Sequence, residues 1–231
     1  MFFIGFDRNE MPSPAQMDSL RATNSSLSWC GYYLAPAPKH SDTSWMGNRG
    51  NLLGNGWLPV PIFLPTPPAT VVHTGGADGS GGAAEATLAL HLASNEGFPG
   101  GTYIYLDLES GDALSSDGED YIEQWVQTLT NAGYRAGIYC SYLLAPQIAK
   151  VVDQLNPTPN VRIWAFRIMT TASHTLQPDL DQITAADPAG SHAPQASLWQ
   201  FEQNAVINAP GTAIDGLDVD MSFSDMQDPS L

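Results

Sequence analysis

The sequence predicts an α/β fold, a single (β/α)8 barrel of the TIM type that spans residues 1–231. The length of 231 residues suits one large domain of this kind. Eight apolar, strand-like runs follow one another, and helical patterns or long loops separate them. A doubly wound open sheet is the alternative, but Asp7-Arg-Asn-Glu-Met-Pro12 stands where the glycine fingerprint of that fold should follow the first strand.

The N-terminal part of the chain alternates strand and helix signals. Its apolar, aromatic-rich runs favour strands, although two prolines in the third run remove ladder donors. Ser13 as N-cap and Pro14 at the first helical position mark the start of the first helix. In order, the expected elements are a strand at 2–7, a helix at 15–22, a strand at 27–34, a short helix near 51–53, a strand at 58–64 and a small-residue helix at 82–95.

The C-terminal part supplies the other five strands. The clearest helix places Tyr121, Trp125 and Leu129 at helical spacing, and Gly133 is positioned to cap it. Residues 169–196 are mostly polar, so the helices after the later strands are expected to be shortened or missing. In order, the expected elements are a strand at 102–109, a helix at 119–131, a strand at 135–141, a helix at 143–155, strands at 161–167, 196–201 and 214–221, and a short closing helix within 222–231.

Composition excludes several classes of partner. The formal net charge of -16 would repel nucleic acid and anionic membranes. No segment approaches the roughly 20 apolar residues that span a bilayer. The first residues lack the basic region of a signal peptide, so localisation stays open. We expect a monomer that binds a neutral or weakly charged polymer.

The two cysteines and the histidines point to no metal or redox chemistry. Cys30 and Cys140 each lie in an apolar strand-like run, as buried free thiols usually do. A disulfide between them is the less favoured alternative. His40, His91, His174 and His192 show no metal-ligand spacing. We therefore expect neither a metal site nor a cofactor.

Two acids close the fourth strand and form the centre of the expected site. In this strand Tyr103, Tyr105, Asp107 and Glu109 share one face, because successive strand residues point to opposite sides. Ionised carboxylates are costly to bury unpaired. The pair therefore predicts an active site; the structural alternative is that an arginine such as Arg135 or Arg167 holds it.

Further acids stand near the ends of other strands. Asp7 closes the first, and Asp218 and Asp220 lie late in the eighth. In a (β/α)8 barrel these ends meet at one rim, where reactive groups lie. Such a cluster suits glycoside hydrolysis, in which one carboxyl group donates a proton and another stabilises a cationic transition state. Aromatic residues that could stack on sugars at this rim are Tyr33, Trp45, Trp57, Tyr105, Tyr139, Trp164 and Trp199.

The glycine-rich segment 74–82 is a less specific feature. It lacks the Lys-Ser/Thr and the spacing of a phosphate-binding loop. A rim loop that leads into a helix is the favoured interpretation. Within it Asp78, and just before it His73, are candidate contacts to substrate.

Seven motifs, in a fixed order along nearly the whole chain, carry a family resemblance. They are Gly5-Phe-Asp7, residues 29–34, His73-Thr-Gly-Gly76 with Asp78-Gly79, Ile104-Tyr-Leu-Asp107-Leu-Glu109, Ala132-Gly-Tyr-Arg-Ala-Gly-Ile-Tyr139, Trp164-Ala-Phe-Arg167 and Asp215-Gly-Leu-Asp-Val-Asp220. With them the chain resembles a glycoside-hydrolase-like barrel family, formerly of unknown function, that includes Tat-exported mycobacterial envelope proteins. That family is similar to the family 25 glycoside hydrolases, lysozymes that cleave peptidoglycan.

The resemblance implies a role for each acid. It makes Glu109 the general acid and Asp107 its electrostatic partner, which positions the N-acetyl group of the substrate as nucleophile. Asp7 and one of Asp218 and Asp220 would bind or orient substrate, with Asp220 taken as the catalytic member. The substrate-binding candidates are then Asp218, Tyr33, Tyr105, Tyr139, Trp164, Arg167, Asp78 and His73. The chain departs from the lysozymes in the turn that follows Asp7.

Three functions remain open at this point. The leading one is a glycosidase that acts on an N-acetylhexosamine polymer, with peptidoglycan as the best candidate, at the cell envelope or outside the cell. The second is a non-catalytic cell-wall-binding module on the same barrel. The third, a metal-dependent phosphoesterase, is disfavoured because only 8 residues are Lys or Arg.

Overall fold

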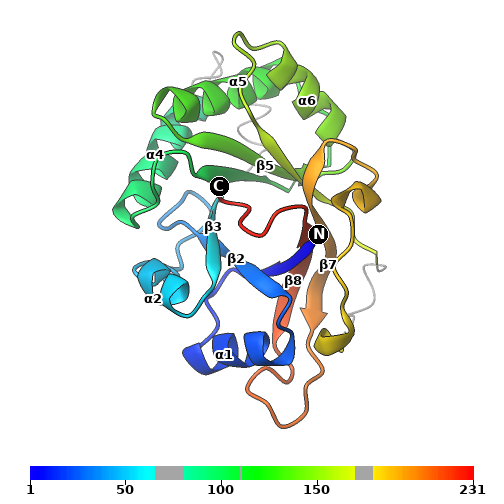
Figure 1. The fold of residues 1–231 in the computed structure, drawn as a ribbon. Coiled ribbons are helices and arrows are strands. Elements are labelled where there is room, and N and C mark those ends of the chain that lie inside the picture. Colours follow the sequence, from blue (N-terminus) through cyan, green and yellow to red (C-terminus); the bar gives the residue numbers. More distant parts are fainter. Residues whose placement is uncertain (66–80, 110, 170–178) are drawn as a thin grey trace.

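The computed structural model describes residues 1–65, 81–109, 111–169 and 179–231, which form a closed eight-stranded barrel (Figure 1). The strands follow the chain order around the barrel, as the sequence predicts. Their bounds are β1 Phe3–Asp7, β2 Leu27–Tyr33, β3 Leu58–Phe63, β4 Tyr103–Leu108, β5 Arg135–Ser141, β6 Arg162–Phe166, β7 Ala196–Val206 and β8 Asp218–Ser224. Both cysteines are buried free thiols, as expected.

The eighth strand departs from the ideal barrel. Strands β1 to β7 pair in parallel, whereas β8 is antiparallel to both β7 and β1. Strand β7 also continues to Val206, past the expected end at 201, and β8 begins at Asp218 rather than at 214. The short segment 207–217 joins them, which suits antiparallel neighbours because a parallel return needs a crossover of a dozen or more residues.

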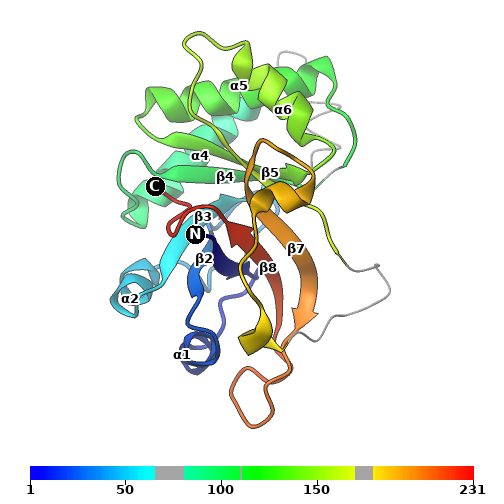
Figure 2. The ribbon, with the colours of Figure 1, turned by 45° about the vertical axis from the view of Figure 1, so that its right-hand side comes forward.

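The α-helices surround the barrel except beside β7 and β8. Figure 1 shows them above, below and to the left of the strands, and Figure 2 shows β7 and β8 on the side where residues 188–191 and loops take their place. Beyond β6 the described residues contain two short 3-10 helices, which confirms that the later helices are shortened or missing. The helices are α1 Pro14–Thr23, α2 Arg49–Gly54, α4 Gly81–Asn95, α5 Ser116–Asn131 and α6 Ala145–Asp153, with η1 Leu180–Gln182 and η2 Pro188–Ser191. In the part of the chain that the structure describes, none of them is long and apolar enough to cross a membrane.

Local sequence signals account for the helix ends. The Ser13 hydroxyl accepts a hydrogen bond from the backbone N–H of Gln16, and the Gln16 side chain accepts one from the N–H of Ser13, a complete capping box. Gly133, just after α5, has φ of 80°, a left-handed conformation that glycine adopts without strain. Both signals confirm the predicted boundaries.

Large aromatic side chains fill the barrel beneath the rim. Trp29 and Tyr105 both pack edge-on against Trp164, with ring centroids 5.3 and 5.6 Å away. Gly5 makes room for Trp29, because a Cβ at this position would lie 2.1 Å from the Trp29 ring. The interior is therefore a packed core, and the acids lie one layer above it.

The C-terminal tail closes the end of the barrel opposite the acids. The Tyr105 hydroxyl and the Arg162 guanidinium donate to the carbonyl of Pro229 at 2.8 and 3.0 Å. The Tyr103 N–H donates to the carbonyl of Ser230 at 2.8 Å. The tail contains no helix, so the expected closing helix within 222–231 is wrong: β8 occupies its first residues, and the rest forms bends and a turn at the barrel end.

Candidate functional site

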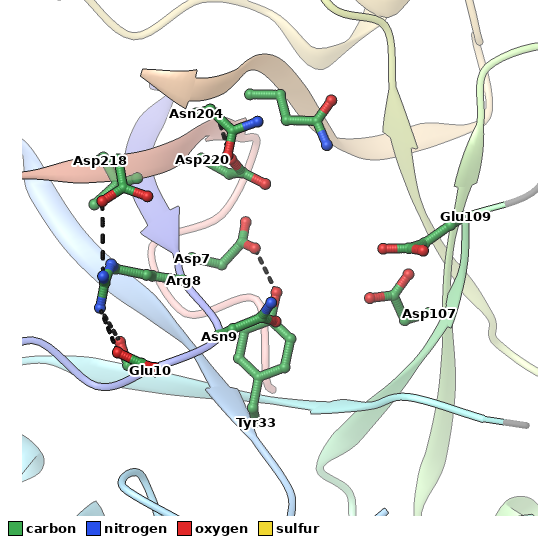
Figure 3. A pocket seen from close by; sticks show the side chains of 12 residues that line it. Asp7, Arg8, Asn9, Glu10, Tyr33, Asp107, Glu109, Asn204, Asp218 and Asp220 are labelled. Carbon is green, nitrogen blue, oxygen red and sulfur yellow. Dashed lines mark hydrogen bonds and ion pairs between the residues drawn. The ribbon is translucent and has the colours of Figure 1, made fainter. Parts of the chain in front are cut away.

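Acids from β1, β4 and β8 converge at one rim of the barrel. Asp7 on β1 lies directly opposite Asp220 in the antiparallel register with β8. Figure 3 shows Asp107 and Glu109 on the facing wall, with their carboxyl groups toward the same space. The predicted convergence is present, but for β8 the cause differs. Because β8 runs in the opposite direction, its first residues, and not its last, reach the rim where the other strands end.

The acids line a pocket of about 320 Å³ that narrows to a deeper recess of about 30 Å³. Six residues line both parts: Asp7, Tyr33, Asp107, Glu109, Gln203 and Asp220. The outer part adds Arg8, Asn9, Glu10, Asn204, Asp218 and Val219. The recess adds Ile62, Tyr139 and Trp164. The structure thus brings eight of the twelve predicted site residues to one cavity.

Asp7 is positioned by the neighbouring strand β2. The Tyr33 hydroxyl donates a hydrogen bond to Asp7 Oδ1 at 2.7 Å. Gly31 lies against the same side chain, and a Cβ there would come within 2.5 Å of the Asp7 Cβ. The glycine and the tyrosine of this segment therefore act together, one leaving space for the carboxyl group and the other fixing its direction.

Asp220 is held by β7. Gln200 Nε2 donates to Asp220 Oδ2 at 3.0 Å, and the backbone N–H of Asn204 donates to Oδ1 at 2.7 Å. Strand β7 is bulged at this point, with register shifts between Gln200 and Ala205, and Asn204 has φ of 52°. The bulge turns the Asn204 N–H toward Asp220, a common use of bulges beside functional sites.

Two buried carboxylate oxygens in the pocket have no hydrogen-bond partner. Asp7 and Asp107 are 5% and 7% exposed, and their Oδ2 and Oδ1 atoms, respectively, are unpartnered. Burial without a donor disfavours the charged form of a carboxyl group. A substrate that donates hydrogen bonds would satisfy both atoms.

This burial and crowding shift the pKa values of the acids upward. Burial raises the pKa of Asp107 well above its usual range, and the nearby Glu109 and Asp220 raise it further. Burial and Asp220 likewise raise the pKa of Asp7, against the opposing hydrogen bond from Tyr33. The pKa of Asp220 rises to about 6, because burial outweighs the two hydrogen bonds from β7. The cluster can therefore hold protons at mildly acidic pH.

Glu109 is exposed, unlike the buried Asp7 and Asp107 and the half-buried Asp220. It follows the last residue of β4, and it faces the pocket two residues after Asp107. This placement leaves its carboxyl group free to approach a molecule bound in the pocket.

The recess has an aromatic floor. Tyr139 and Trp164 pack edge-on with ring centroids 5.5 Å apart, and Trp164 Nε1 donates to Ser222 Oγ at 3.1 Å. Burial and the surrounding acids raise the pKa of the Tyr139 phenol. Trp164 is almost fully buried, so it closes the floor and does not stack on a sugar at the rim.

Two predicted substrate contacts lie elsewhere. Tyr105 is fully buried, one layer down, with its hydroxyl on Pro229. The Arg167 guanidinium donates to the carbonyl of Gly190 at 3.2 Å and lies over the Tyr142 ring. His73 and Asp78, the other two, fall outside the described residues.

The tryptophans expected at the rim are placed differently as well. Trp57 packs on Phe6 and Trp199 on Phe223, both on the outer face of the barrel. Trp45 is buried, and its Nε1 donates to the carbonyl of Arg8. Alternation along a strand gives the face of a residue, but the depth of its layer depends on the register of all eight strands.

Sequence reasoning missed several pocket residues. Arg8 and Glu10 lie in the loop after β1, and Arg8 Nη2 is 3.6 Å from Asp218 Oδ1. Arg8 Nη1 also donates to the Glu10 carbonyl at 3.0 Å and is 3.7 Å from the Glu10 carboxylate. On β7, Gln203 and Asn204 line the pocket past the expected strand end. The sequence could have revealed Arg8 and Glu10, because they lie within three residues of Asp7, the acid that closes the first strand.

The alternative that arginines hold the central acids is not supported. Arg135 lies over the Tyr103 ring at 5.3 Å, and Arg167 contacts η2 as described above. In the described part of the chain, no group of three or more His, Cys, Asp or Glu side chains is arranged to hold a metal ion.

Comparisons with known proteins give one family and one fold. A family model described as Rv2525c-like, glycoside hydrolase-like domain matches residues 21–222. An uncharacterized protein of B. stearothermophilus is 19% identical, with 97% of each chain covered and a TM-score of 0.66. No curated protein matches the chain.

Two further solved structures are informative. The Tat-secreted protein Rv2525c of Mycobacterium tuberculosis is 19% identical, with 96% of this chain and 93% of that chain covered and a TM-score of 0.54. A bacterial lysozyme from Streptomyces coelicolor is 15% identical, with 97% and 92% covered and a TM-score of 0.58. At these identities the likeness shows a shared barrel fold.

Proposed function

Because this chain belongs to the Rv2525c-like, glycoside hydrolase-like domain family, we propose that it hydrolyses an N-acetylhexosamine-containing polymer, with peptidoglycan as the substrate. The observation that supports this most is the placement of Asp107 and Glu109 on one wall of a pocket whose other wall carries Asp7 and Asp220. The fold shared with a lysozyme is consistent with this substrate.

Glu109 is the general acid. Its exposed carboxyl group at the end of β4 can reach the oxygen of a glycosidic bond that lies across the pocket. It transfers its proton to this oxygen as the bond to the anomeric carbon breaks. The leaving sugar thereby departs as a neutral alcohol.

Asp107 orients the nucleophile. Its unpartnered Oδ1 accepts a hydrogen bond from the amide N–H of the N-acetyl group on the reacting sugar. This contact turns the acetyl carbonyl oxygen toward the anomeric carbon, to which it bonds as the leaving group departs. Water then opens the cyclic intermediate, with Glu109 taking the proton, in the substrate-assisted variant of glycoside hydrolysis.

Asp220 favours the transition state from the opposite wall, where Asp7 binds the substrate beside it. Positive charge develops on the sugar ring, and a carboxylate fixed by Gln200 and Asn204 needs little reorganisation to stabilise it. The recess below, floored by aromatic side chains, excludes bulk water from this face of the ring.

The test is the release of reducing ends from purified peptidoglycan. Wild-type protein should release them, and Glu109→Gln should lower the rate by at least about a hundredfold, since it removes the proton donor. Glu123→Gln, a change at a half-buried residue on α5 outside the pocket, is the matched control and should act as wild type. Equal rates for Glu109→Gln and wild type would refute the assignment.

A non-catalytic cell-wall-binding module is the second candidate. The observation that favours it is Arg8, which brings a cation into the pocket where a glycosidase needs negative charge. In that case wild type and Glu109→Gln would release no reducing ends, and both would sediment with peptidoglycan.

We propose that the protein acts at the cell envelope or outside the cell, because the related Rv2525c is Tat-secreted. We also expect it to be a monomer.

A further inference from the structure

The pocket is far richer in acceptors than in donors. Six carboxyl groups line it, and Arg8 is the one cationic side chain among the described lining residues. The exposed amides of Asn9 and Gln203 add neutral groups at the rim. The six acids are Asp7, Glu10, Asp107, Glu109, Asp218 and Asp220.

The donors that lie nearest these acids are already engaged. Tyr33 donates to Asp7 Oδ1, and β7 supplies both donors to Asp220. The Arg8 guanidinium contacts Asp218 and Glu10, whose two negative charges exceed its single positive charge, although its Nε has no partner. The protein itself therefore leaves the inner acids without a counter-charge.

Asp7 is the clearest case of an acid that awaits a ligand. It is 5% exposed, it lines both parts of the pocket, and its Oδ2 has no partner. Figure 3 shows it on β1, across the cavity from Asp107 and Glu109, the two residues that act on the reacting sugar in the proposed function. A group that meets Asp7 thus belongs to a neighbouring sugar of the polymer.

We propose that this neighbouring sugar carries a free amino group, so that the natural polymer is partly de-N-acetylated, and that its ammonium binds Asp7. This inference rests on the proposed function for the polymer. An ammonium supplies three donors and a positive charge, whereas an acetamido group supplies one N–H and no charge. The former matches an inner pocket with unpartnered carboxylate oxygens and no free cation.

The proton balance of binding separates the two kinds of sugar. A neutral sugar would cover Asp7 without compensating its charge, which favours the protonated carboxyl and leads to proton uptake. An ammonium favours the ionised form, so protons leave the protein on binding. The raised pKa of Asp7 in the free protein supports this linkage, because there is a proton to release at mildly acidic pH.

The experiment compares two tetrasaccharides by titration calorimetry on Glu109→Gln, which prevents turnover. One is fully N-acetylated chitotetraose and the other is its fully de-N-acetylated counterpart. At about pH 5.5, where amines remain protonated, the amino tetramer should bind at least about tenfold more tightly. Two buffers of different ionisation enthalpy should show that protons are released.

Variants locate the contact. Asp7→Asn, added to Glu109→Gln, should remove the preference for the amino tetramer over chitotetraose. Asp107→Asn removes a similar buried carboxyl group from the other wall and should lower this preference less. If Asp7→Asn does not fold, Asp220→Asn serves instead, since it removes the acid paired with Asp7 in the register, and it should also weaken the preference. A preference that survives the change at Asp7, or at Asp220 in its place, would overturn the proposal.

Controls address the net charge of -16, which attracts any cation. Tetralysine should bind at least about tenfold more weakly than the amino tetramer, because its ammonium groups are not held in sugar geometry. Equal binding of tetralysine, or equal binding of the two tetrasaccharides, would sink the inference. Failure of the proposed function would look different: wild-type protein would release no reducing ends, while the binding preference could still be measured.

Discussion

At the scale of single residues, the site is a set of acids placed where they cost stability. Asp7, Asp107 and Asp220 are raised in pKa mainly by burial. An acid whose pKa is higher in the folded state than in the unfolded chain destabilises the fold once it ionises. Such a loss of folding stability is typical of functional sites, and the packing of the core does not require it.

The first prediction concerns Asp107. Asp107→Asn removes a buried ionisable group that has an unpartnered oxygen, so the variant should be more stable than wild type at about pH 8 by roughly 1–2 kcal/mol. The melting temperature should rise by roughly 2–6 °C, as measured by calorimetry. Below about pH 3 the gain should disappear, because the carboxyl is then largely protonated in both states. A lower melting temperature at the higher pH would contradict the burial argument.

The pH dependence of wild type follows with a definite sign. Between the unfolded pKa near 3.8 and the folded pKa of about 6 for Asp220, the folded state binds more protons than the unfolded chain. The free energy of unfolding therefore falls as pH rises through this window, and the more strongly raised Asp7 and Asp107 extend the fall to higher pH. Thermal melts from about pH 4 to about pH 8 should show this decline, and Asp220→Asn should flatten its lower part. Stability that increases over this range would refute the pKa directions.

At the scale of elements, the position of Asp220 depends on the bulged strand β7 and the reversed strand β8, two features that a regular (β/α)8 barrel lacks. Alternation along β4 was enough to predict that Asp107 and Glu109 share a face, because period-two patterns are local. The direction of β8 was not predictable, since an apolar run reads the same in both directions. The Asn204 bulge was equally hidden, because its conformation is imposed by pairing with β8.

The bulge gives the third prediction. Asn204 has φ of 52°, so Asn204→Gly should keep both the backbone and the N–H to Asp220, with nearly wild-type stability and activity. Asn204→Val should cost roughly 1–2 kcal/mol, since a branched side chain disfavours this conformation. Melting temperatures and reducing-end release should both separate the two variants. Indistinguishable variants would show that the bulge does not position Asp220.

At the scale of the whole molecule, the aromatic core and the C-terminal tail, which stabilise the barrel, lie apart from the acids of the candidate site at its rim. The order of strands, the cap of α1, the end of α5 and the acid rim could be predicted, because each depends on local pattern or on the general geometry of barrels. The depth of Tyr105 and the ion pairs of Arg8 could not, since they depend on register and on loop conformation. The tail beneath the barrel was mistaken for a helix because its sequence shows which residues are apolar but not what they contact.

The tail gives the last prediction. Removal of residues 229–231 would take away the acceptors of Tyr105 Oη, Arg162 and the Tyr103 N–H, all at the end of the barrel opposite the pocket. The loss should cost roughly 2–4 kcal/mol and lower the melting temperature by roughly 4–12 °C. Gln227→Ala, whose side chain makes none of these contacts, is the control. At low temperature, where the shortened protein is still folded, reducing-end release should match wild type, because the acids are held by β1, β2, β4, β7 and β8 alone. A loss of activity without a loss of stability would mean that the tail acts on the pocket through the aromatic core, and that the two ends of the barrel are coupled.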